Sequence, residues 1–210
     1  MRRLFNPDAP IMVFLTKLAY CAYLNILWLI CCIPIVTVGA ATTALFTVTL
    51  KMVKNEEGNI TSQFFRAFKE NFKQSTIVWL ILLALGILLA LDGYALYRLR
   101  FENAFWTCLT AIYLIVLAAY AIITMYIYAL MAYFENSIIN MFKNSIMIGM
   151  RYLICTAVMA AIYFAMACIV INVLTPLIVF AEALCAYFCS YLLSNVFKAC
   201  EGPRDDAETV

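Results

Sequence analysis

The sequence contains no histidine and very little charge, and both absences narrow its function. Without histidine there is no Ser-His catalytic triad and no His-dependent zinc protease site. No GxxxxGK[ST] phosphate-binding loop is present, so ATP hydrolysis by that route is excluded. A net charge of only +2 gives no electrostatic footprint for nucleic acid. We therefore predict a protein that is not an enzyme and binds no nucleic acid.

Charged residues make up 12% of the chain and hydrophobic residues 67%. A soluble domain has about a quarter charged residues, and a soluble chain this apolar could not cover its own core with polar surface. Glycine and proline are also scarce, which excludes disordered and collagen-like chains. The composition predicts one all-α integral membrane domain, a polytopic transmembrane helix bundle over residues 1–200, followed by a short charged tail over 201–210.

Nine cysteines are present, but none shows a CxxC spacing. Eight of them fall in apolar runs, where a thiol behaves as a small apolar packing group. Cys185 and Cys189 are four residues apart and share a helix face, but without histidine a transition-metal site is not expected there. The sequence predicts no metal, cofactor or disulfide.

Six segments are apolar enough to cross a bilayer, for which a helix needs about 20 residues. The predicted spans are residues 12–32, 39–53, 76–97, 104–132, 152–173 and 177–197. The first span is expected to be uncleaved, because no small-residue cleavage site follows it. Segment 39–53 is short, so five spans remain an alternative.

The distribution of basic residues favours six spans. With six, twelve Lys and Arg residues lie on one side, including Lys17, while only Arg98 and Arg100 lie on the other. The positive-inside rule then predicts that both termini are cytoplasmic. With five spans the basic segments would be split between the two sides: the amphipathic segment would share a side with the tail, while Arg2 and Arg3 would lie opposite.

An amphipathic helix is predicted over residues 61–74. Phe64, Phe65, Phe68 and Phe72 recur at helical spacing, and basic residues fill the rest, as in helices that lie in the membrane interface. Residues from this helix and from the more polar segment 135–150 are predicted to form a cytoplasmic docking surface: Arg66, Phe68, Lys69, Lys73, Phe142 and Lys143.

Polar and ionisable residues inside spans are costly and are therefore functional candidates. Asn25, Asp92 and Glu182 are the candidate intramembrane polar or ligand contacts. Glu182 is expected to pair with Arg98 or Arg100 or to be kept neutral by burial. Alternatively, it contacts a solute in an outward-opening pocket near Asn25 and Asp92. Asn25 is expected to form an interhelical hydrogen bond.

Small residues suggest where helices approach each other closely. Ala157, Ala161 and Ala165 form a stripe that predicts a packing face on the fifth span. Thr42 and Thr43 begin the second span, where their hydroxyls are expected either to bond back to their own helix or to line a polar layer.

The N-terminal third resembles the YesL-like family of bacterial membrane proteins, a domain of unknown function. The resemblance is carried by Met1-Arg2-Arg3-Leu4-Phe5-Asn6-Pro7, by Leu24-Asn25-Ile26-Leu27-Trp28, by Cys32-Ile33-Pro34-Ile35-Val36-Thr37-Val38-Gly39-Ala40 and by Phe64-Phe65-Arg66-Ala67-Phe68-Lys69. Members of that family are often encoded beside carbohydrate ABC transporters.

The resemblance implies a location in the bacterial cell membrane and an accessory or regulatory role in carbohydrate uptake, with ABC transporter subunits as partners. It carries over no catalytic residue. The alternative function is a small solute-binding transport subunit or channel, which would use the pocket near Asn25, Asp92 and Glu182.

Overall fold

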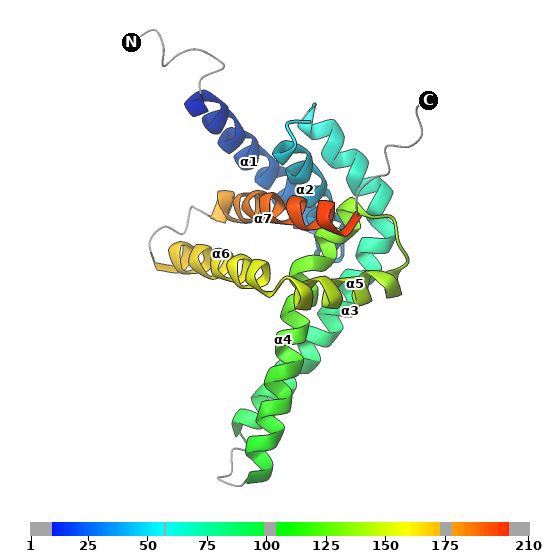
Figure 1. Ribbon diagram of the computed structural model, residues 1–210, viewed down its shortest axis with the longest axis vertical. Coiled ribbons are helices and arrows are strands. Elements are labelled where there is room, and N and C mark those ends of the chain that lie inside the picture. Colours follow the sequence, from blue (N-terminus) through cyan, green and yellow to red (C-terminus); the bar gives the residue numbers. More distant parts are fainter. Residues whose placement is uncertain (1–9, 57, 99–103, 173–177, 202–210) are drawn as a thin grey trace.

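The computed structural model describes residues 10–56, 58–98, 104–172 and 178–201. This part of the chain forms seven α-helices, one short 3-10 helix and no strand, which confirms the all-α class (Figure 1). The helices are α1 (Pro10–Cys32), η1 (Ile35–Thr37), α2 (Val38–Val53), α3 (Ile60–Arg98), α4 (Ala104–Tyr133), α5 (Ile138–Arg151), α6 (Leu153–Asn172) and α7 (Ile178–Glu201).

Within the described residues, six helices are long and apolar enough to cross a membrane: α1, α2 with η1, α3, α4, α6 and α7. Their bounds agree with the six predicted spans to within a few residues, except at the start of α3 and the end of α7. Arg2, Arg3 and nearly all of the predicted tail lie outside the described residues. The protein is thus an integral membrane protein by the length and composition of its helices.

The centre of the bundle is α2. It contacts α1, α3, α4 and α7, and 12 of its 16 residues are buried. At a rise of 1.5 Å per residue this helix is only about 24 Å long, less than the ~30 Å hydrocarbon thickness. Other helices surround α2 in place of lipid. Its short length therefore leaves few backbone polar groups without a hydrogen-bond partner in the bilayer core.

The α2 and α3 backbones approach each other closely at Gly39. A Cβ atom at Gly39 would lie 2.5 Å from the Ser75 carbonyl oxygen and 2.6 Å from Trp79 Cβ, so only glycine fits there. Two hydrogen bonds hold the same crossing: Ser75 Oγ donates to Thr43 Oγ1 at 2.9 Å, and Trp79 Nε1 donates to the Ile35 carbonyl at 2.7 Å.

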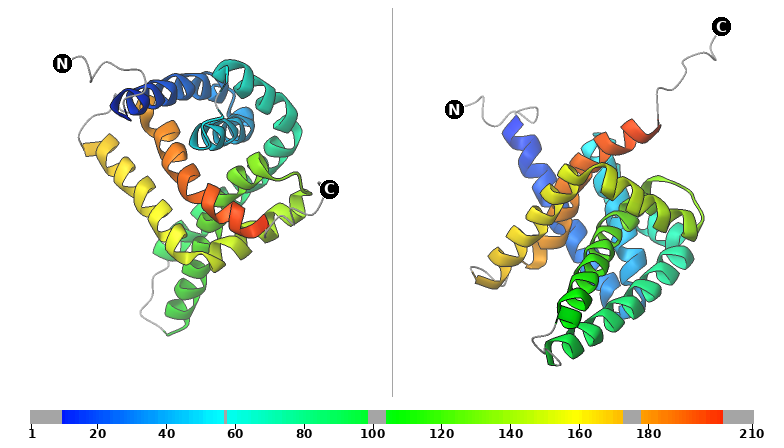
Figure 2. Two further views of the ribbon diagram at one scale, coloured as in Figure 1. Left: turned by 45° about the horizontal axis from the view of Figure 1, so that its top comes forward. Right: turned by 60° about the horizontal axis from the view of Figure 1, so that its bottom comes forward.

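The start of α3 differs from the prediction of a separate interfacial helix over 61–74. Residues 60–98 form one continuous helix, which curves past α2 (Figures 1 and 2). Phe64 is fully buried, as are Ser75 and Val78 further along, because the same helical stripe continues into the span. No glycine or proline interrupts residues 60–85, so nothing ends the amphipathic part before the span begins.

Beyond the bundle, α3 and α4 continue as a pair of helices (Figure 1). Two glycines on α3 each face one tyrosine of α4, and the members of each pair are seven residues apart in the sequence. Tyr120 Oη donates to the Leu82 carbonyl at 3.1 Å, and a Cβ at Gly86 would lie 2.7 Å from that hydroxyl. Tyr113 Oη repeats the arrangement on the Leu89 carbonyl at 3.3 Å, facing Gly93.

On the other side of the bundle, α6 and α7 lie side by side (Figure 2). The predicted packing stripe on α6 is wrong: Ala157, Ala161 and Ala165 are all exposed, and Met159 is the buried residue of that helix. Small residues at i, i+4 spacing share a face, but in lipid that face can stay unpartnered at no polar cost.

The α3–α4 contact gives a testable prediction. Gly86→Ala should destabilise the protein by about 1–3 kcal/mol, because the new methyl group forces Tyr120 Oη away. Tyr120→Phe should lower stability only slightly, but it removes the atom that clashes. The double variant should therefore be more stable than Gly86→Ala alone, as measured by thermal unfolding in detergent. Strictly additive losses would contradict this account of the contact.

Candidate intramembrane binding site

A cavity of about 240 Å³ lies between five helices of the bundle. It is lined by Trp28 of α1, by Val38, Thr42 and Phe46 of α2, by Thr124, Met125 and Tyr128 of α4, by Tyr163 of α6 and by Glu182 of α7. The volume is below the ~300–1,000 Å³ of pockets for drug-sized molecules. The cavity is therefore suited to a small ligand of mixed apolar and polar character.

Glu182 lies near the start of α7 and is the acidic residue of the cavity. Among the described residues its carboxylate makes no ion pair and no hydrogen bond; the ion pair that they contain joins Arg66 and Glu70. The expected pairing with Arg98 is absent, because the Arg98 guanidinium lies on Tyr94, with Nε donating to the tyrosine hydroxyl at 2.9 Å. Arg100 lies outside the described residues.

Asn25 links α1 to α7 beside this carboxylate. Its side chain is fully buried, and its Oδ1 accepts a hydrogen bond of 2.9 Å from the backbone N–H of Ala183. The predicted interhelical hydrogen bond is thus confirmed. Because Ala183 follows Glu182 directly, this bond fixes the part of α7 that carries the carboxylate, and Asn25 itself does not line the cavity.

The threonines of α2 combine the two expected arrangements. Thr42 and Thr43 donate to the carbonyls of Val38 and Gly39, at 2.8 and 3.0 Å. The same oxygens also accept from neighbouring helices: Trp28 Nε1 donates to Thr42 Oγ1 at 3.2 Å, and Ser75 Oγ donates to Thr43 Oγ1. Each hydroxyl group therefore donates a hydrogen bond within its own helix and accepts one from a neighbouring helix, which helps to hold the helices together.

Asp92 does not join the cavity. It lines a separate hollow of about 470 Å³ between α3 and α4, together with Trp106 and Tyr113. The predicted single pocket containing Asn25, Asp92 and Glu182 is therefore wrong for Asp92. The reason is the length of α3, which carries Asp92 along the part of the hairpin where side chains are mostly exposed.

Aromatic cavity residues and a hydroxyl without a partner were missed at the sequence level. Tyr128 is 5% exposed, and its hydroxyl has no hydrogen-bond partner among the described residues. Nothing in a chain with 13 tyrosines distinguishes Tyr128 or Tyr163 in advance. Only the tertiary packing of α4 and α6 within the bundle brings them to the cavity that contains Glu182.

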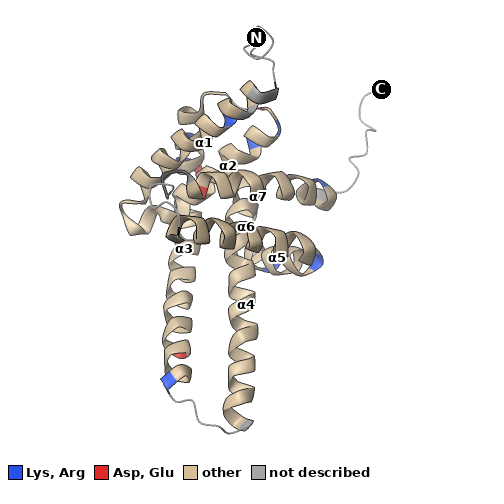
Figure 3. Ribbon diagram, turned by 90° about the vertical axis from the view of Figure 1, so that its left-hand side faces the viewer, with Lys and Arg blue, Asp and Glu red and all other residues tan. Residues whose placement is uncertain are grey.

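Basic side chains gather at the end of the bundle where α2, α4 and α7 finish, and we call this the basic end. Lys17 Nζ donates to the Met52 carbonyl at 2.8 Å and to Asn55 Oδ1 at 2.7 Å, so it caps the C-terminus of α2. Lys54 Nζ lies 4.7 Å from the ring centroid of Tyr133, which packs on Phe197. Through these contacts the C-terminal ends of α2, α4 and α7 lie together with Lys17 of α1. Long stretches of the helices carry no charge (Figure 3).

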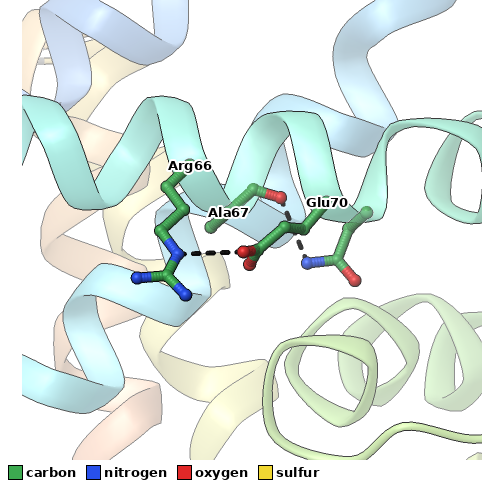
Figure 4. Close-up of polar contacts among 4 residues, drawn as sticks. Arg66, Ala67 and Glu70 are labelled. Carbon is green, nitrogen blue, oxygen red and sulfur yellow. Dashed lines mark hydrogen bonds and ion pairs between the residues drawn. The ribbon is translucent and has the colours of Figure 1, made fainter.

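The residues predicted as a docking surface are only partly accessible. Arg66, Lys69, Lys73 and Lys143 are exposed, but Phe68 and Phe142 are partly buried against the core. Arg66 forms an exposed ion pair with Glu70 at 2.9 Å, beside the hydrogen bond from Asn71 to the Ala67 carbonyl (Figure 4). Such exposed pairs contribute little to stability, so these charges remain available to solvent.

The cysteines are free thiols. Cys21, Cys185 and Cys189 are buried in the bundle and act as packing residues, as predicted, whereas Cys108 and Cys200 are exposed. No group of three His, Cys, Asp or Glu residues that could hold a metal ion occurs in the described part of the chain.

Comparison with known proteins gives one match. A family described as "Protein of unknown function, DUF624" matches residues 21–93, about a third of the chain. The matched stretch covers the second half of α1, all of α2 and most of α3, and it contains Asn25, Trp28 and Gly39. The chain matches none of the curated proteins and none of the solved structures with which it was compared.

The role of Asn25 can be tested against a matched asparagine. Asn25→Ala should lower the stability by about 1 kcal/mol, because it removes the bond between α1 and α7. Asn71→Ala removes a bond of 3.1 Å that stays within α3, so it should cost less. Thermal unfolding of both variants in the same detergent measures the difference. Equal losses would mean that the interhelical bond carries no special weight.

Proposed function

We propose that this protein is a non-enzymatic accessory or regulatory component of a carbohydrate uptake system in a bacterial cell membrane. The observation that carries the proposal is the set of exposed basic side chains at one end of an otherwise apolar bundle. Lys69, Lys73 and Lys143 are exposed and form no ion pair with any described residue. Unpaired charges of one sign favour the docking of a partner of opposite charge and accelerate its encounter.

The positive-inside rule supports a cytoplasmic position for the basic end and for both termini, since twelve of the fourteen Lys and Arg residues would lie there. The partner would then be an acidic surface on a cytoplasmic or cytoplasm-facing subunit of an ABC transporter. The carbohydrate part of the proposal rests on the resemblance to the YesL-like family. The match to a family of unknown function is compatible with it and assigns no activity.

A second candidate function is solute binding by a membrane-embedded transport subunit. It is favoured by a different observation, the cavity that contains an unpaired carboxylate, Glu182. The two candidates use opposite parts of the molecule, so they can be tested separately.

The accessory role predicts that charge reversal at the basic end uncouples the protein from its transporter. Lys69→Glu/Lys73→Glu should reduce several-fold the co-purification of carbohydrate ABC transporter subunits from cells grown on the transported sugar. The control is Arg98→Glu, which reverses an exposed charge at the last residue of α3, away from the basic end.

The control should leave co-purification near the wild-type amount. Sugar uptake should fall in a deletion strain and be restored by the wild type and by the control variant only. Equal recovery of transporter subunits with all three proteins, or unchanged uptake in the deletion strain, would refute the accessory role.

A further inference from the structure

The cavity beside Glu182 leaves two polar groups without partners at the same place. The Glu182 carboxylate has no hydrogen bond or ion pair among the described residues, and the buried Tyr128 hydroxyl has none either. Folded proteins rarely leave buried polar groups unsatisfied, and a charged group in a span is more costly still. Two such groups lining one cavity indicate a site that is completed by a ligand.

The charge of the cavity selects the sign of that ligand. No lysine or arginine among the described residues lines it, so this part of the chain supplies no counter-charge to Glu182 there. Three aromatic side chains with polar tips, Trp28, Tyr128 and Tyr163, also line the walls. Aromatic rings attract cations, most strongly where water is excluded. A carboxylate among such rings repels anions and favours a positively charged ligand.

The other wall residues decide between a metal ion and an organic cation. A hard metal ion takes six or more oxygen ligands, or at least several carboxylates and carbonyls. The cavity offers one carboxylate, and its remaining walls include Val38, Phe46 and Met125. Such apolar walls suit alkyl groups, so an organic cation fits better than a bare metal ion.

A neutral sugar fits less well, because the hydroxyl groups of the cavity are largely engaged already. Thr42 accepts from Trp28 Nε1 and donates to the Val38 carbonyl, and Thr124 Oγ1 donates to the Tyr120 carbonyl at 2.8 Å. These bonds also occupy the only donor of Trp28. Few groups remain to bond the several hydroxyls of a sugar, whereas one ammonium group needs only one carboxylate and a set of rings.

We propose that this cavity binds a small organic cation carrying an ammonium group, with Glu182 as its counter-charge and Trp28, Tyr128 and Tyr163 around it. Asn25 is a positioning residue, because its bond to Ala183 fixes the start of α7 that carries Glu182. The assignment rests on the solute-binding candidate and names its ligand class. It does not depend on the docking of a transporter at the basic end.

The test uses the purified full-length protein in nanodiscs and isothermal titration with choline chloride and tetramethylammonium chloride. Potassium chloride controls for ionic strength, and glucose tests for a neutral sugar. The wild type should bind both organic cations and neither control. Glu182→Gln should weaken binding at least tenfold. Asp92→Asn, which neutralises the carboxylate of the other hollow, should bind as the wild type does.

A second pair of variants compares the contribution of the tyrosine ring with that of its hydroxyl. It also keeps the proposal testable if Glu182→Gln does not fold. Tyr163→Phe keeps the ring and should retain binding within a few-fold, whereas Tyr163→Leu should lose most of it.

Binding of glucose but not of the cations would overturn the cation assignment and leave solute binding standing. No binding by well-folded wild type, or unchanged binding by Glu182→Gln, would also overturn it. The variants at Lys69 and Lys73 should bind the cations normally, which distinguishes a failure here from a failure of the accessory role.

Discussion

The packing of α2 against its four neighbours is the constraint on which the rest of the structure depends. A 16-residue helix cannot present the usual length of apolar surface to lipid, so it is placed among protein helices, where small residues let the backbones approach. The contact of Gly39 with Ser75 and Trp79 sets the crossing of α2 and α3. The same helix supplies Val38, Thr42 and Phe46 to the cavity, so this packing also shapes the candidate site.

Polar groups in the bundle follow one rule with few exceptions: they are satisfied by the helices themselves. Threonine and serine hydroxyls donate to carbonyls of the preceding turn, and Tyr113 and Tyr120 donate to carbonyls of α3. Without water in the hydrocarbon core, every such group needs an internal partner. The buried exceptions among the described residues are Gln63 Oε1, Thr76 Oγ1 and Tyr128 Oη, and the last of these lies in the cavity with Glu182. That coincidence points to a function at that place more strongly than the mere presence of an acidic residue in a span.

The molecule divides into two chemically different parts. The basic end joins the start of α1 to the ends of α2, α4 and α7 through Lys17, Lys54 and an aromatic cluster around Phe197. The cavity lies among the first half of α2, the start of α7 and the middle of α6. The cavity and the basic end are joined by α2, α4 and α7, which contribute residues to both.

The sequence by itself determined the helical class, the number of apolar helices and most of their bounds, because hydropathy and helix breakers act within about 20 residues. It also identified Asn25 and Glu182, since polar groups in a span are rare enough to be noticed. Only the tertiary structure decided that α2 lies at the centre, that α3 is continuous, that Asp92 is far from Glu182 and that the alanine stripe of α6 is exposed. Helical periodicity shows which residues share a face. It does not show whether that face meets protein or lipid, because both are apolar and only the packing of whole helices distinguishes them.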